Sequence, residues 1–475
     1  METLELKDIQ GIIVRGYANM PAAEFILLRI GDAGLAKKWL QLITAEVTSA
    51  EEKKGDSAVN IALTYNAMSV LGLSPQTLDS FPMELEDGMN TKHKQFFLGD
   101  YGTSDPENWE WGGCNSAPVD ILLMLYAINT ETMQAVHTRH LSQFAAFGLI
   151  EIKTLDTSVL YERKEHFGFQ DGISQPTIKG LSRQDAPENM IAAGEFILGY
   201  KNEYNQYSQS PLVAADSKAA KILPGSLEEQ GKYDLGKNGS YLVFRQLKQD
   251  VGLFWNYMEK CTRDEKGECN GKEMVKLAAK MLGRWPGGAP VVVCPDEEIK
   301  DHNDNNAFEY RKVDELGLKC PFASHIRRSH PRDSLDMNRA ASIKVANKHR
   351  ILRRGRSYGT PVTETMNPHD ISKAKDTQGD RGLHFICFNG DIGRQFEFIQ
   401  NAWSNNPKFN GLHDERDPIT GNHSHPENKK TTGTFTIPDK NLRKRFTDVP
   451  EFVTVKGGAY FFMPGIKALK YLACL

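Results

Sequence analysis

The segment HFGFQDGISQP, residues 166–176, holds the carboxylate whose surroundings best suit proton chemistry. Asp171 stands directly before a glycine, and an Asp-Gly pair on its own is typical of a surface turn. The nearby Phe167 and Phe169 give this aspartate an apolar approach in which its carboxylate would be partly desolvated. A carboxylate in such a setting can take and return protons, so we predict that Asp171 is an acid–base residue.

A second segment, KCPFASHIRRSHPR at residues 319–332, combines a histidine with several arginines. His325 lies between Phe322 and Ile326 in a run of helical character, where a satisfied core histidine is the more common finding. An imidazole beside guanidiniums nevertheless suits an iron porphyrin, because the nitrogen binds the metal and the guanidiniums pair with the propionates. The guanidiniums near His325 belong to Arg327, Arg328 and Arg332.

A third segment, RILRRGRSYG at residues 350–359, extends this basic region. Between Lys319 and Arg356 there are eleven Lys or Arg residues and only two acids, in a chain whose net charge is −3. A solvated surface or a nucleic-acid-binding surface would explain such a run. Few aromatic residues interrupt it, which disfavours a platform for single-stranded nucleic acid. An anionic cofactor or substrate fits the run better.

The composition is that of an ordinary globular protein. The 475 residues are 40% hydrophobic and 25% charged, which excludes disordered and collagen-like classes and allows two or three domains. No stretch approaches the roughly 18 apolar residues of a membrane span, and the acidic start METLELKDIQ does not resemble a secretory signal, so we expect a cytoplasmic protein. The seven cysteines are scattered, which favours reduced thiols over disulfides or a zinc site.

Hydrophobic patterns predict an α+β architecture, with helices packed on antiparallel sheets. We expect strands at residues 11–17, 24–30, 59–65, 119–128 and 148–155, and helices at 33–47, 74–89 and 132–147. In the second half we expect strands at 240–247, 289–294 and 383–388, and helices at 251–258 and 394–403. A polar stretch beginning near residue 181 separates the two halves of the chain. We therefore predict two domains, residues 1–190 and residues 191–475.

The segments GFQDG, CPFASHIRRSHPR and ILRRGRSYG resemble, in order and spacing, the signature segments of dye-decolourising peroxidases. The resemblance extends over essentially the whole chain, including KDIQGIIVRGY, NGSYLVFRQLKQDVGLFW, AAKMLGRWPGGAP and FEFIQNAWSNNPKF, and is to the long branch of the family. The chain departs from the family pattern at Ser324, His330 and Ser357, and none of these departures removes a catalytic group.

This resemblance implies two ferredoxin-like lobes of the dimeric α+β barrel-like superfamily, with haem b held chiefly by the C-terminal lobe. It also implies a peroxidase that reduces hydrogen peroxide to water through a high-valent oxoferryl intermediate and oxidises dyes, phenolics or other one-electron donors. The expected partners are therefore hydrogen peroxide and organic donors, with neither nucleic acid nor membrane, and a homodimer is compatible with the family.

By their positions in the motifs, Asp171 would be the distal acid–base residue, Arg353 the distal arginine and His325 the proximal iron ligand. Asp417 resembles the carboxylate that bonds the proximal imidazole, and Asp414 remains an alternative. The resemblance further implies cofactor contacts from Arg328, Gly172, Ile173, Phe388 and Phe398.

Two other classes of protein remain open from the sequence. A non-catalytic haem-binding or haem-handling protein would use His325 but would not need Asp171 and Arg353 together, and a polyanion-binding protein would need only the basic run. Because a free aspartic acid titrates at about 3.9 and a histidine at about 6.5, an enzyme that uses Asp171 should remain active at mildly acidic pH.

Overall fold

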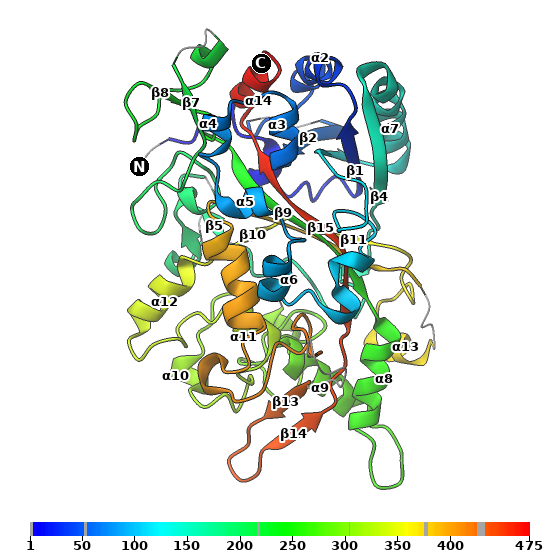
Figure 1. Ribbon diagram of the computed structural model, residues 1–475. Coiled ribbons are helices and arrows are strands. Elements are labelled where there is room, and N and C mark those ends of the chain that lie inside the picture. The colour runs from blue at the N-terminus through cyan, green and yellow to red at the C-terminus, as the bar shows by residue number, and fades with distance from the viewer. Residues whose placement is uncertain are drawn as a thin grey trace.

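The computed structural model describes residues 3–51, 55–181, 183, 185–215, 219–303, 305–374, 379–424 and 433–475. A long antiparallel sheet runs through these residues, in the order β10-β12-β9-β15-β2-β3-β1-β4, with β11 also paired to β12 (Figure 1). It joins strands from both halves of the chain.

The N-terminal part of this sheet has the ferredoxin-like strand order. Its strands are β1 (Ala22–Ile30), β2 (Ser57–Leu63), β3 (Ile121–Ala127) and β4 (Leu149–Asp156), in the spatial order β2-β3-β1-β4. The crossover helices are α2 (Ala33–Thr44) and α7 (Thr130–Phe144). The Asp32 side chain accepts a hydrogen bond from the amide of Leu35 at 2.8 Å and so caps the start of α2.

The C-terminal part repeats that order. Its strands are β9 (Ser240–Gln249), β10 (Leu352–Arg353), β11 (Arg356–Tyr358), β12 (Gly382–Asn389) and β15 (Val453–Met463), in the order β10-β12-β9-β15. Counted along the chain, each unit therefore places its second strand at one edge and its fourth at the other. The pairing of Phe462 in β15 with Leu63 in β2 joins the two ferredoxin-like units into one sheet.

The sheet curls until its two edges meet. Ser158, just after β4, forms an isolated bridge with Ser357 in β11, and a ring nitrogen of His384 in β12 lies 3.0 Å from the carbonyl oxygen of Asp156. Phe25 of β1 packs against Phe244 of β9 with ring centroids 5.5 Å apart, although these strands belong to different units. The fold is therefore barrel-like, with one apolar core inside the curl.

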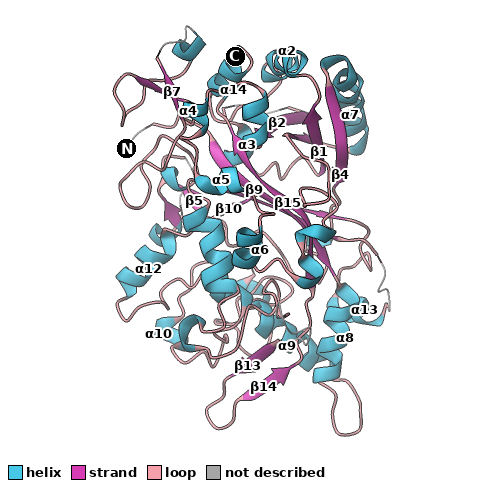
Figure 2. Ribbon diagram, viewed as in Figure 1, coloured by secondary structure: helices cyan, strands magenta, loops and turns pink. Residues whose placement is uncertain are grey.

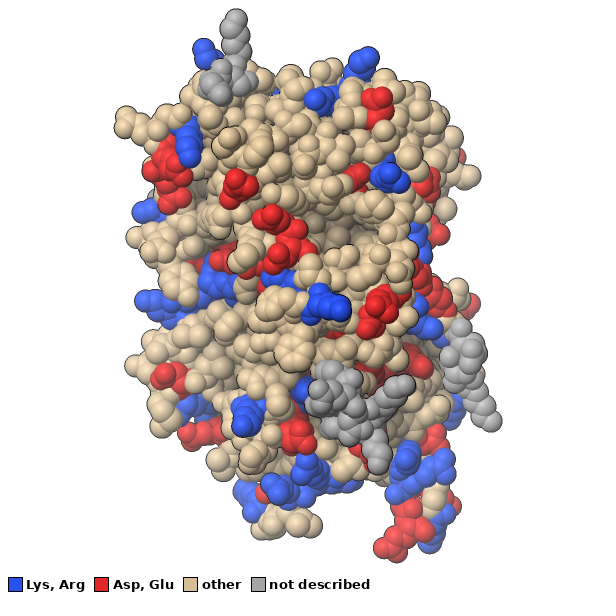
Figure 3. Space-filling model, viewed as in Figure 1, with Lys and Arg blue, Asp and Glu red and all other residues tan. Residues whose placement is uncertain are grey.

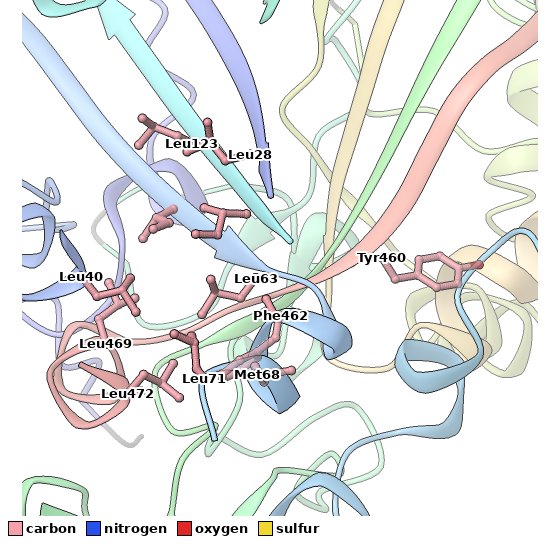
Figure 4. Packing of buried hydrophobic residues seen from close by; sticks show 14 of the residues in the cluster. Leu28, Leu40, Leu63, Met68, Leu71, Leu123, Tyr460, Phe462, Leu469 and Leu472 are labelled. Atoms are coloured by element: carbon pink, nitrogen blue, oxygen red, sulfur yellow. The ribbon is translucent and has the colours of Figure 1, made fainter. Parts of the chain in front are cut away.

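A second core covers the outer face of the sheet. Because successive strand residues point to opposite faces, Phe25 and Leu27 enter the inner core while Ile26 and Leu28 enter the outer one. In Figure 4, Leu28, Leu63 and Leu123 from the strands approach Leu40, Leu469 and Leu472 from two helices. These helices are α2 and the C-terminal α14 (Ile466–Leu472), which lie beside each other (Figure 1).

The remaining elements are short and lie largely between and below the two units, where loops predominate (Figure 2). The helices are α1 (Gly11–Val14), α3 (Tyr65–Val70), α4 (Pro75–Leu78), α5 (Met83–Asp87), α6 (Lys92–Leu98), α8 (Val251–Cys261), α9 (Gly271–Leu282), α10 (Arg311–Asp314), α11 (His325–Ser329), α12 (Arg339–Asn347) and α13 (Pro368–Lys373). The short strand pairs are β5 (Thr177–Ile178) with β6 (Met190–Ile191), β7 (Leu212–Ala214) with β8 (Lys232–Asp234), and β13 (Thr434–Ile437) with β14 (Lys444–Thr447).

Most of the elements expected from the sequence are present, and four segments differ. Residues 11–17 were expected as a strand but begin with the helix α1, and residues 289–294, also expected as a strand, form buried turns. The expected helix at 74–89 is divided into α4 and α5, because Pro82 precedes α5 as its N-cap. The expected helix at 394–403 has π-helical hydrogen bonding over Gly393–Glu397 and Ile399–Ser404. Among the described residues, no helix is long and apolar enough to cross a bilayer.

Candidate functional site

A cavity lies against the sheet of the C-terminal unit and brings the three sequence segments together. Alternate residues of three neighbouring strands form one wall: Leu247 and Gln249 from β9, Leu383 and Phe385 from β12, and Val453 and Val455 from β15. Asp171, Arg353 and His325 line the same cavity, as do Gly172 and Ile173.

A tight hairpin carries Asp171 into the cavity. The amide of Asp171 donates to the carbonyl of Arg163 at 3.1 Å and closes this hairpin. The next residue, Gly172, has φ = +83°, a conformation that glycine adopts without strain, and its amide donates to Asp171 Oδ1 at 2.6 Å. The Asp-Gly pair is thus a turn, as its sequence alone suggests, but its aspartate faces the cavity.

Arg353 approaches Asp171 from the edge of the sheet. It lies in β10 opposite Cys387 of β12, and its amide donates to the side-chain oxygen of Gln175 at 3.1 Å. Its Nη1 atom donates to Asp171 Oδ1 at 2.9 Å. Residues 182 positions apart in the sequence therefore form one charged pair inside the cavity.

The surroundings of Asp171 favour its ionised form. Burial alone would raise the pKa of this carboxyl, but the Arg353 guanidinium and the Gly172 amide outweigh that effect and hold the pKa below its usual value. Asp171 is therefore a carboxylate at mildly acidic pH and is available to accept a proton.

His325 is the first residue of the short helix α11, and it is oriented by Asp417. Its Nδ1 atom lies 2.8 Å from Asp417 Oδ2, and the other oxygen of Asp417 accepts the amides of Ile419 and Thr420 at 2.9 and 3.0 Å. Asp417 is fully buried. Of the two aspartates considered from the sequence, Asp417 makes this contact, whereas Asp414 uses its backbone carbonyl to accept the Thr434 hydroxyl.

His325 and Asp417 shift each other's pKa in opposite directions. Burial lowers the pKa of His325, but the Asp417 carboxylate outweighs it and the net shift is upward. Burial raises the pKa of Asp417, and His325 and the hydrogen-bond donors bring it below its usual value. A carboxylate on Nδ1 increases the donor strength of the imidazole and leaves its Nε2 atom for the cavity.

Arginines with no carboxylate partner line another part of the cavity. Arg332 donates to the backbone oxygens of Asn306 and Phe308, and Arg350 contacts His330 Nε2 at 3.0 Å and the carbonyl of Ser174. Within the described ranges, neither guanidinium forms an ion pair. Burial lowers the pKa of Arg350 to about 9, with Arg332 adding to the effect. This part of the cavity is therefore suited to an anionic group.

Three residues expected to contact a cofactor do not line the cavity. The Arg328 guanidinium donates to the carbonyls of Trp403, Asn406 and Glu415, so its donors bind the backbone. Phe388 lies in the inner core, because in β12 it points to the face opposite Leu383 and Phe385. Phe398 stacks on His349 with ring centroids 3.9 Å apart, while His349 itself lines the cavity.

Sequence reasoning missed several lining residues. Leu383 and Phe385 face the cavity. Because side chains two residues apart in a strand share a face, the sequence could have placed these two together, without saying on which face. Arg350 lies in the basic run but was not singled out. Arg332 was named beside Arg327 and Arg328, and nothing in the sequence distinguishes it from these two. Glu165 and Gln249 also line the cavity, and no sequence signal pointed to either.

Most of the basic run is buried or half-buried rather than exposed on the surface. Arg327 and Arg328 are fully buried, and Arg332 and Arg350 are only 6% and 5% exposed. Arg327 pairs with Asp314 at 2.9 Å. On the face shown in Figure 3, acidic and basic side chains are interspersed. These arginines therefore do not form the exposed basic surface that polyanion binding requires.

Comparisons with known proteins agree over nearly the full length. No family model matches the chain. "Peroxidase 2" of Mycetinis scorodonius is 29% identical over 98% of this chain and 87% of that protein, and the "Multifunctional dye peroxidase" of an Amycolatopsis species is 26% identical over 98% and 96%. The solved structure of an ancestral D-type dye-decolorizing peroxidase superposes with a TM-score of 0.79 and 27% identity, covering 99% of both chains. The chain belongs to the dye-decolorizing peroxidases.

Another solved member, a fungal peroxidase from Auricularia auricula-judae, has a TM-score of 0.78 and 25% identity to this dye-decolorizing peroxidase over all of both chains. The enzyme is thus an oxidoreductase of a haem-dependent family.

The residues of the cavity fit a haem. His325 has no partner on its Nε2 atom among the described residues and lines the cavity. Arg332 and Arg350 offer two guanidiniums that have no carboxylate partner in the described part of the chain, which matches the two propionates of a haem. Apolar side chains make up much of the remaining lining, with Leu282, Ile326, Leu383, Phe385, Ile399 and Ile419 among them. Among the described residues, no cluster of three or more His, Cys, Asp or Glu could hold a bare metal ion instead.

Proposed function

We propose that this peroxidase uses haem b to reduce hydrogen peroxide to water while oxidising dyes, phenolics or other one-electron donors. The observation that carries the proposal is that two charged pairs share one cavity. Asp171 is paired with Arg353 at 2.9 Å, and His325 is paired with Asp417 at 2.8 Å.

The proposed cofactor contacts follow from the donors in the cavity. His325 Nε2 would bind the iron, with Asp417 fixing the ring through Nδ1. Arg332 and Arg350 would bind the propionates, and Leu383 and Phe385 would contact the apolar part of the ring. When bound, the haem supplies the iron that transfers electrons between the donors and the peroxide.

Asp171 would carry the proton during peroxide cleavage. In its ionised form it accepts the proton from one oxygen of hydrogen peroxide and delivers it to the other oxygen, which leaves as water. Two one-electron donors and two protons complete the reduction of peroxide to two water molecules. The low pKa of Asp171 keeps the accepting form present under mildly acidic conditions.

Arg353 would stabilise the charge that develops on the departing oxygen. Its guanidinium already lies 2.9 Å from the acid–base carboxylate. A donor that is already fixed in place stabilises developing charge without reorganisation. Arg353 therefore serves both to set the pKa of Asp171 and to lower the barrier to O–O cleavage.

Replacing the acid–base carboxylate tests the proposal. Asp171→Asn should retain haem, measured by Soret absorbance, and lose about 10²- to 10⁴-fold in kcat/KM for hydrogen peroxide. The exposed Asp301→Asn is the matched control and should behave as wild type. An Asp171→Asn protein with full activity would refute the acid–base role. A wild-type protein that binds haem without turning over peroxide would instead be a haem-binding protein.

A further inference from the structure

Glu165 lies in the same hairpin as Asp171 and on the same side of it. Within residues 163–171, the amide of Asp171 donates to the carbonyl of Arg163 at 3.1 Å, and the amide of Glu165 donates to the carbonyl of Phe169 at 2.9 Å. In an antiparallel pair, side chains two residues apart share a face. Glu165 and Asp171 are therefore diagonal neighbours, and both line the cavity.

The Glu165 carboxylate closes the turn of this hairpin. Its Oε2 atom accepts the amide of Phe167 at 2.9 Å, and its Oε1 atom accepts the amide of Phe169 at 3.0 Å. Between them, Gly168 has φ = +94° and donates its amide to the Glu165 carbonyl at 2.8 Å. A single side chain thus satisfies two of the amides that the tight turn leaves without backbone acceptors.

A third hydrogen bond attaches the hairpin to the sheet. The side-chain amide of Gln249, the last residue of β9, donates to Glu165 Oε2. Gln249 is itself fixed in the sheet, where it pairs with Val453 of β15 and donates its backbone amide to Arg381 at 2.9 Å. The carboxylate of Glu165 therefore connects the turn to the wall of the cavity.

Asp171 has few contacts of its own to fix its direction. Among the described residues, its carboxylate is bound only by the amide of Gly172 and by Arg353. Its position in the cavity consequently depends on the backbone of the hairpin. A displacement of about 1 Å at a reacting group can cost about 10²-fold in rate.

We infer that Glu165 is a positioning residue for peroxide cleavage, which holds the hairpin against β9 so that Asp171 meets the peroxide. This inference rests on the proposed function. Glu165 acts through the backbone and takes no proton in the reaction. Burial raises its pKa to about 7, although the amides of Phe167 and Phe169 and the side chain of Gln249 oppose the shift. Tests at about pH 8 therefore examine the ionised carboxylate.

The test compares Glu165→Gln with Glu162→Gln in the haem-loaded full-length protein. Glu162 is exposed, and its one ion pair among the described residues is with Lys164 at 3.2 Å, so its variant should behave as wild type. Glu165→Gln should keep its haem content and its KM for the organic donor, and should lose about 10- to 100-fold in kcat/KM for hydrogen peroxide. Amide hydrogen exchange of a peptide covering residues 166–171 should become faster.

A second variant approaches the same contact from the sheet. Gln249→Leu removes the third hydrogen bond and leaves the two within the turn, so its loss of kcat/KM should be smaller than that of Glu165→Gln. It keeps the inference testable if the Glu165 variant does not fold.

The outcomes separate this inference from the proposed function. A wild-type protein without peroxide turnover refutes the proposed function, and the exchange measurement still decides whether Glu165 holds the hairpin. With an active wild type, unchanged kcat/KM in Glu165→Gln overturns the positioning role, even if exchange becomes faster. Unchanged amide hydrogen exchange of residues 166–171 in Glu165→Gln overturns the positioning role as well.

Discussion

Removing the charge of Arg353 should move the acid limit of activity to higher pH. In the structure, burial acts to raise the pKa of Asp171, and the guanidinium of Arg353 at 2.9 Å is the main influence that holds it down. Arg353→Leu removes this influence and leaves the burial in place. The pKa of Asp171 should therefore rise above its usual value.

The size and sign of the pKa shift expected for Asp171 follow from its pairing with Arg353. An opposite charge within about 4–6 Å lowers the pKa of an aspartate by roughly 1–3 units, and the same amount should be regained when that charge is removed. Asp171 accepts a proton only when ionised, so activity is lost as the pH falls through its pKa. The acidic limb of the pH profile should thus move upward by roughly 1–3 units.

The assay is kcat/KM for hydrogen peroxide as a function of pH, because this ratio reports the ionisation of the free enzyme. Haem content is measured in parallel at each pH. Arg353→Lys retains a positive charge without the planar fork, so its limb should move less than that of Arg353→Leu. The absolute rate should fall in both variants, but the position of the limb is the test. An acidic limb that stays in place in Arg353→Leu would refute the coupling of Arg353 to Asp171.

Three further predictions concern stability and cofactor binding. Arg327→Met leaves Asp314 as an unpaired buried carboxylate and should lower the free energy of unfolding by about 3–5 kcal/mol. Urea unfolding measures this loss, and a loss below about 1 kcal/mol would contradict the stabilising role of the pair. Arg350→Gln should weaken haem binding about tenfold or more, because a hydrogen bond to a charged group contributes about 1.5–3 kcal/mol. The measurement is a haem titration of the haem-free protein, and an unchanged affinity would mean that Arg350 does not bind the haem. Leu123→Ala, in the centre of β3, should cost about 2–5 kcal/mol, and a near-neutral result would mean that the outer core closes around the lost volume.

The strands of the two ferredoxin-like units could largely be predicted from the sequence. Residues 24–30, 119–128 and 240–247 are dense in β-branched and apolar residues, and each forms a strand. The continuous pairing of the units could not be predicted, because it depends on the pairing of Phe462 with Leu63, which are 399 positions apart in the sequence. The segment 289–294 has strand composition but folds as turns, because Pro290 cannot donate a hydrogen bond to a sheet.

The charge run shows what sequence leaves undecided about the site. Eleven basic residues within 38 positions look like a surface feature, yet Arg327 and Arg328 are fully buried. Arg327 is neutralised by Asp314, and Arg328 is satisfied by three carbonyl oxygens. Only the fold separates these structural arginines from Arg332 and Arg350, which lack carboxylate partners among the described residues and line the cavity.

The family resemblance implied Phe388 as a cofactor contact, but in β12 the cavity is lined by Phe385 and not by Phe388. The β12 sequence LHFICF has large side chains at nearly every position, since the strand is buried on both faces, and such a strand shows no alternation of polar and apolar residues. The sequence therefore cannot say which phenylalanine faces the cavity. The strand pairing determines which phenylalanine faces the cavity. Phe385 pairs with Arg245, which lines the cavity, and Phe388 pairs with Leu242, which lies in the inner core. A shift of one residue in this pairing would exchange the two faces and turn Leu383 and Phe385 away from Asp171, so the register of β12 determines the composition of the pocket.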